Sequence, residues 1–60
     1  MGTLQSAIEG CVKECLDSPT PFLCVSGYCD RLRDDGAFTP EEIDDIGVQA
    51  WRTLRRILDQ

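Results

Sequence analysis

The chain has 60 residues, 42% of them hydrophobic, and its 11 acidic and 6 basic residues give a formal net charge of −5. This length suits one small domain (residues 1–60), the apolar content is too high for a disordered tail, and the acidity disfavours direct binding to the phosphates of nucleic acids or anionic lipids. No apolar run approaches the roughly 18 residues of a membrane-spanning helix, and the first residues lack the pattern of a signal peptide. We therefore expect a cytoplasmic protein that does not bind a membrane.

The first predicted helix covers about residues 3–17. From Leu4 to Leu16, apolar residues recur at the three- and four-residue spacing of one helical face. Thr3 is placed to cap the start of this helix. Pro19 ends it, because a residue that precedes proline avoids the helical conformation.

The second predicted helix covers about residues 20–35 and begins with a threonine followed by a proline, which is typical of a helix start. An apolar face then runs from Phe22 to Leu32. Gly27 either weakens this helix by about 1 kcal/mol relative to alanine or marks a close helix contact. Gly36 is typical of the left-handed residue that follows a helix.

The third predicted helix covers about residues 39–59 and has the strongest local pattern. Thr39 and Glu42 have the spacing of a capping box, and an apolar stripe that includes Trp51 follows them. We expect Trp51 to anchor the core. Together the three segments predict an all-α fold, a compact three-helix bundle formed by an antiparallel helical hairpin and a longer C-terminal helix.

All four cysteines lie in the predicted hairpin, as a C-x3-C pair (Cys11 and Cys15) and a C-x4-C pair (Cys24 and Cys29). If the hairpin turns near Pro19, Cys15 lies level with Cys24, and Cys11 lies level with Cys29. Residues five apart are about 140° apart around a helix, so Cys24 and Cys29 cannot both face the first helix. Cys11–Cys29 fits this geometry, whereas a Cys15–Cys24 disulfide requires the second helix to begin late or to twist.

The same stretch resembles the helical-hairpin families built on twin C-x3-C motifs, although its second motif is one residue longer. The resemblance implies oxidised cysteines and an oxidising compartment. Two other interpretations stay open. Reduced cysteines can act as small buried hydrophobic residues, which is what we expect in a cytosol. Four cysteines can also bind zinc, but the helical spacing and the lack of histidine fit structural zinc sites poorly, so we predict no metal site and no cofactor.

Acidic residues concentrate between residues 34 and 45, where six acids and no base give a local charge of −6. Glu41 and Glu42 suit the start of a helix, where the helix dipole favours anions, but Asp34 and Asp35 near the end of the preceding helix have no such explanation. We predict that this segment, the acidic junction, binds a partner. Its residues are Asp34, Asp35, Glu41, Glu42, Asp44 and Asp45.

The residues present argue against three familiar functions, namely calcium binding by an EF-hand, DNA binding by a helix-turn-helix and catalysis. An EF-hand in this segment would place Arg31 and Arg33 at calcium-ligand positions. A helix-turn-helix reader would direct the carboxylates that begin the third helix at DNA phosphates, so we predict no direct binding to duplex DNA. The absence of histidine and the short chain, which cannot enclose a sizeable pocket, predict a protein that is not an enzyme.

These observations lead to a protein-binding hypothesis, in which the acidic junction, with Tyr28 and Leu23, docks on a partner with a basic surface. In size, charge and lack of motifs the chain resembles phage and mobile-element inhibitors, including many anti-CRISPR proteins, and this implies an inhibitor that covers a nucleic-acid-binding surface. Gly27 and Gly47 would allow a close helix crossing, either within the monomer or in a homodimer. The alternatives are a disulfide-stapled secreted or periplasmic helical hairpin and, more weakly supported, a structural zinc module.

Overall fold

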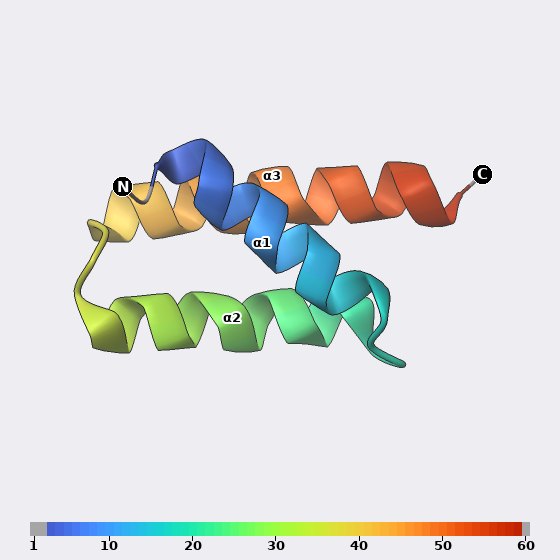
Figure 1. The fold of residues 1–60 in the computed structure, drawn as a ribbon, viewed down its shortest axis with the longest axis horizontal. Helices are drawn as coiled ribbons and strands as arrows, with labels where there is room; N and C mark the ends of the chain where they lie inside the picture. The colour runs from blue at the N-terminus through green and yellow to red at the C-terminus, as the bar shows by residue number, and fades with distance from the viewer. Residues whose placement is uncertain (1–2, 60) are drawn as a thin grey trace.

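The computed structural model describes residues 3–59 and contains three helices, α1 (Leu4–Leu16), α2 (Pro21–Asp35) and α3 (Pro40–Leu58). The predicted all-α three-helix bundle is confirmed. In Figure 1, α2 and α3 run antiparallel, and α1 crosses them diagonally. Each helix contacts both of the others.

The ends of the helices follow the capping residues of the sequence. The hydroxyl of Thr3 accepts a hydrogen bond from the backbone N–H of Ser6 at 3.1 Å. At the start of α3, Thr39 Oγ1 accepts from the N–H of Glu42 at 3.2 Å, and Glu42 Oε1 accepts from the N–H of Thr39 at 2.9 Å, which completes the predicted capping box. Gly36 follows α2 with φ of 68°, in the left-handed region that glycine adopts without strain.

The core lies mainly between α1 and α3. Nine hydrophobic residues are buried, and α2 supplies only one of them, Val25. The others come from α1 (Ala7, Cys11, Val12 and Cys15) and from α3 (Ile43, Ile46, Ala50 and Leu54). Hydrophobic burial therefore holds α2 less firmly than it holds the other two helices.

Two expectations about packing are wrong. Trp51 is not a core anchor, because it lies at the edge of the apolar stripe of α3 and is 39% exposed. Its ring packs against that of Phe22, with 5.4 Å between the ring centroids. Gly27 marks no close helix contact, since a Cβ built there would have no atom of another helix within 4 Å.

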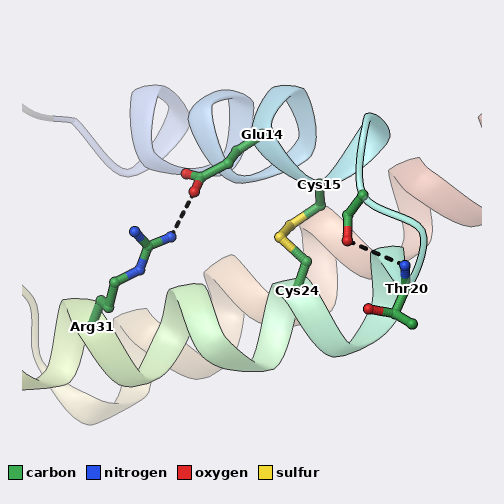
Figure 2. Close-up of a disulfide and its surroundings, with 6 residues drawn as sticks. Glu14, Cys15, Thr20, Cys24 and Arg31 are labelled. Atoms are coloured by element: carbon green, nitrogen blue, oxygen red, sulfur yellow. Dashed lines mark hydrogen bonds and ion pairs between the residues drawn. A yellow bond between two sulfur atoms is a disulfide. The ribbon is translucent and has the colours of Figure 1, made fainter.

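The cysteine pairing is the reverse of the one that the sequence favoured. Cys15 and Cys24 form a disulfide (Figure 2). Cys11 and Cys29 are free thiols. The angular argument that Cys24 and Cys29 cannot both face α1 still holds, but Cys24 is the residue that faces α1. Cys29 faces α3, where its Sγ lies 3.8 Å from the carbonyl oxygen of Ile43. The expectation that all four cysteines are reduced is therefore wrong for this pair.

The turn between α1 and α2 explains how Cys24 reaches Cys15. Thr20 makes no side-chain capping bond to α2, and instead its backbone N–H donates to Ser18 Oγ at 3.2 Å. Because α2 begins at Pro21, Cys24 lies in its first turn, beside the end of α1. The disulfide thus joins the two helices next to the turn that connects them.

Candidate functional site

The acidic junction surrounds the connection between α2 and α3. Asp34 and Asp35 end α2, and the other four acids lie in the first two turns of α3. Five of the six side chains are exposed; only Glu42, which closes the capping box, is partly buried. The structure therefore gives Glu42 a role in the fold and leaves the other five carboxylates on the surface.

Within residues 3–59, the carboxylates of the junction form no ion pairs. In residues 3–59, the three ion pairs join Glu14 to Arg31, Asp30 to Arg33 and Asp59 to Arg55, and none involves the junction. The exposed acids at the end of α2 also lie at the negative end of its helix dipole. Like charges held close together repel one another, so a partner that brings positive charge would relieve an unfavourable interaction.

Of the two apolar residues assigned to the same surface, one lies away from it and the other lies at its edge. Leu23 is 71% exposed but belongs to the first turn of α2, at the far end of that helix from the junction. Tyr28 is partly buried and faces α1, because its hydroxyl lies 3.1 Å from the position that a Cβ on Gly10 would occupy. Arg31 stacks on the Tyr28 ring, with its guanidinium carbon 5.3 Å from the ring centroid. The structure thus places Leu23 far from the acids, whereas Tyr28 lines a small surface pocket together with Asp35.

A second surface feature was not foreseen from the sequence. An open groove of about 540 Å³ runs between α2 and α3, and we call it the α2–α3 groove. Phe22 and Cys29 line it from α2, and Val48 and Trp51 line it from α3. Phe22, Val48 and Trp51 are 41%, 49% and 39% exposed, so the groove presents apolar side chains to solvent.

The ends of the α2–α3 groove carry charges. Asp44, a member of the acidic junction, lines the groove near the start of α3, and Arg52 lines it two turns further along. Arg33 lines the α2 side, where it pairs with Asp30 at 3.3 Å. The sequence signal for this surface is the 4-3 spacing of Asp44, Val48 and Trp51 along one edge of α3, which Arg55 continues beyond the groove.

The free thiols are poorly suited to nucleophilic chemistry. Cys11 is completely buried, and burial, with smaller contributions from Cys29 and Glu14, raises its pKa from the ordinary 9.0 to about 11. Burial also raises the pKa of Cys29, with Asp30 adding to the shift. Both thiols are therefore protonated at neutral pH, and a protonated thiol is a weak nucleophile.

In the part of the chain from residue 3 to residue 59, no three potential metal ligands lie together in a way that could hold an ion. No helix in that same part is long and apolar enough to cross a membrane. No protein-family model, curated protein or solved structure matches this chain. The surfaces themselves are thus the basis for any functional assignment.

Proposed function

We propose that this chain is a non-enzymatic protein-binding domain, which docks its acidic junction on the basic surface of a partner protein. The observation that carries this proposal is the group of five exposed carboxylates without an ion-pair partner within residues 3–59. Stability of the fold alone does not account for acids at the C-terminal end of α2. Complementary charge across an interface speeds encounter and selects the partner.

The test is capture of binding partners on immobilised protein, followed by elution and identification by mass spectrometry. The informative variant is Asp35→Lys with Asp45→Lys, and the matched control is Glu9→Lys with Asp17→Lys. Both variants change the net charge equally by reversing two exposed carboxylates, inside and outside the junction respectively. We expect the junction variant to bind the partner about tenfold or more weakly, because two interfacial ion pairs of about 1 kcal/mol each would be replaced by repulsion.

The control should retain the partner at nearly the wild-type affinity. Equal retention by both variants would show that the junction is not the binding surface. Equal loss from both would show that only the overall negative charge matters.

A finer version of the proposal is an inhibitor, of the phage or mobile-element kind, that occupies a nucleic-acid-binding surface in the cytoplasm. An anionic domain can occupy a surface that otherwise binds phosphates. Excess nucleic acid should then release the captured partner. Release by salt but not by nucleic acid would contradict the inhibitor version and leave the protein-binding proposal intact.

The Cys15–Cys24 disulfide supports a second candidate, a stapled helical domain that works in a secreted or periplasmic setting. Disulfides persist in oxidising compartments and are rare in a reducing cytosol. Titration of unfolded, unreduced protein purified from its native source should find two free thiols among the four cysteines. Four free thiols would contradict the stapled domain and favour the cytoplasmic assignment.

A further inference from the structure

The exposed edge of α3 carries four residues with coiled-coil spacing. Asp44, Val48, Trp51 and Arg55 follow one another at intervals of four, three and four residues, and all four are exposed. At 100° per residue they fall within about 60° of one another around the helix, so they form one stripe, the α3 stripe. Spacing of this kind lines the seam where one helix packs against another.

The α3 stripe has an apolar centre that the monomer covers only in part. Val48 and Trp51 are 49% and 39% exposed, and both line the α2–α3 groove. Phe22 extends this apolar surface onto α2, through its ring contact with Trp51. Removing these side chains from water would be favourable, in proportion to the apolar area that a partner covers.

The charges at the two ends of the stripe determine which partner fits. Asp44 lies at the N-terminal end, without an ion pair within residues 3–59, and Arg55 lies at the C-terminal end. The stripe therefore reads acid, apolar, apolar, base. Reversed, this order is base, apolar, apolar, acid, so the stripe is complementary to an antiparallel copy of itself.

The antiparallel arrangement also fixes a register. When Asp44 faces Arg55 of the other copy, Val48 faces Trp51 of the other copy, because both pairs of residue numbers sum to 99. A two-fold axis repeats each contact, which gives two ion pairs and two apolar pairs in one interface. A parallel arrangement would place Asp44 against its own counterpart and is disfavoured by repulsion.

The contacts that Arg55 makes within the monomer are compatible with an ion pair to Asp44 of a second copy. Its guanidinium carbon lies 5.4 Å from the centroid of the Trp51 ring, so the cation already lies over the stripe. Its ion pair with Asp59, at 3.8 Å and exposed to solvent, is of a kind that contributes little. Arg55 can therefore turn to an acid of a second chain at small cost.

We propose that the α3 stripe, with the adjoining α2–α3 groove, binds a second copy of this chain in a two-fold symmetric dimer, with the α3 helices antiparallel and Asp44 of each copy paired with Arg55 of the other. The dimer goes beyond the proposed function. Asp34, Asp35 and Asp45 lie off the stripe and stay available to another partner, so either proposal can fail without the other.

The first measurement is the mass in solution, by sedimentation or light scattering, from micromolar to millimolar concentration. The wild-type mass should rise with concentration from 6.7 kDa towards twice that value. The emission of Trp51, the single tryptophan, should shift to shorter wavelength over the same range as its ring becomes covered. A monomer at millimolar concentration would overturn the proposal, and so would a dimer whose formation leaves the tryptophan emission unchanged.

Charge exchange tests the register. Asp44→Arg and Arg55→Asp should each weaken dimerisation by about tenfold or more, since each places like charges opposite one another twice. The double variant carries the same charges in exchanged positions and should recover most of the wild-type affinity. A double variant as weak as either single variant would overturn the pairing.

Asp45→Arg is the matched control for Asp44→Arg. It makes the same change one residue further along α3, at a position about 100° away around the helix. Circular dichroism shows that each variant is folded before its mass is compared. The control should dimerise at close to the wild-type affinity, and disruption as strong as that of Asp44→Arg would show that local charge, rather than the stripe, controls association.

Discussion

At the scale of single residues, Gly27 and Gly36 place opposite demands on the backbone of one helix. Gly27 lies within α2 in the helical conformation, and a Cβ there would meet no atom of another helix within 4 Å. Gly36 ends α2 with φ of 68°, where a residue with a Cβ is strained. Space for a side chain and freedom of the backbone are therefore separate questions at these two positions.

We predict that Gly27→Ala raises the free energy of unfolding by about 0.5–1 kcal/mol, since alanine lowers the entropy of the unfolded chain and favours helix. Gly36→Ala should lower it by about 1 kcal/mol or more, since alanine there must adopt left-handed geometry. Urea unfolding followed by circular dichroism measures both. Destabilisation by Gly27→Ala would mean that this face of α2 is covered.

At the scale of elements, α2 is the helix that most needs a covalent tie. Among residues 3–59 it buries only Val25, whereas α1 and α3 each bury four residues. The Cys15–Cys24 disulfide and the exposed Glu14–Arg31 ion pair, at 2.8 Å, both join α2 to α1 (Figure 2). Exposed ion pairs contribute little, so the disulfide is the more important of the two.

Removing the Cys15–Cys24 disulfide should therefore destabilise the protein markedly. We predict that Cys15→Ala with Cys24→Ala lowers the free energy of unfolding by roughly 2–3 kcal/mol, the cost of freeing a loop of this length in the unfolded chain. A reductant should lower the free energy of unfolding of the wild type, measured by urea unfolding, by a similar amount and leave that of the double variant unchanged. A wild-type midpoint that does not respond to reductant would contradict this role.

Local patterns in the sequence predicted the elements better than their contacts. Thr3, Gly36 and the pair Thr39–Glu42 act on backbone groups within one turn, so the sequence nearby is sufficient to place the helix ends. Whether Cys24 or Cys29 faces α1 depends on how α1 crosses the other helices, and no local pattern encodes that crossing.

At the scale of the whole molecule, the burial of thiol and phenol groups makes the free energy of unfolding fall at alkaline pH. The pKa of Cys11 is about 11 in the folded protein and near 9.0 in the unfolded chain, and burial raises the pKa values of Cys29 and Tyr28 in the same direction. Between pH 9 and 11 the unfolded chain therefore holds fewer protons than the folded protein. Because the unfolded state binds fewer protons, the free energy of unfolding falls as pH rises through this range.

We predict that the free energy of unfolding is nearly constant up to about pH 9 and falls by about 1–3 kcal/mol by about pH 11. Urea unfolding across this range measures the effect, with peptide mapping to confirm that Cys15–Cys24 stays paired. Cys11→Ala should start less stable but lose less stability with pH. An equal pH dependence in this variant would mean that Cys11 is not the main titrating group.

The surface of the molecule was predicted in part. Charge is visible in a sequence, and the acidic residues lie exposed around one connection as expected, apart from the partly buried Glu42. The α2–α3 groove was missed because periodicity assigns an apolar residue to the inside without showing how much room is there. Trp51 lies at the edge of its stripe, where α2 covers only part of so large a ring.

The position of the disulfide also affects the continuity of the chain. Because Cys15 and Cys24 lie on either side of the turn that connects α1 to α2, the peptide bonds of that turn are not the sole covalent link between the two helices. A protease that cuts once between residues 16 and 23 would yield two fragments that stay attached through sulfur. Of the two connections between helices, this turn is thus the one that a single cleavage can open without releasing a helix.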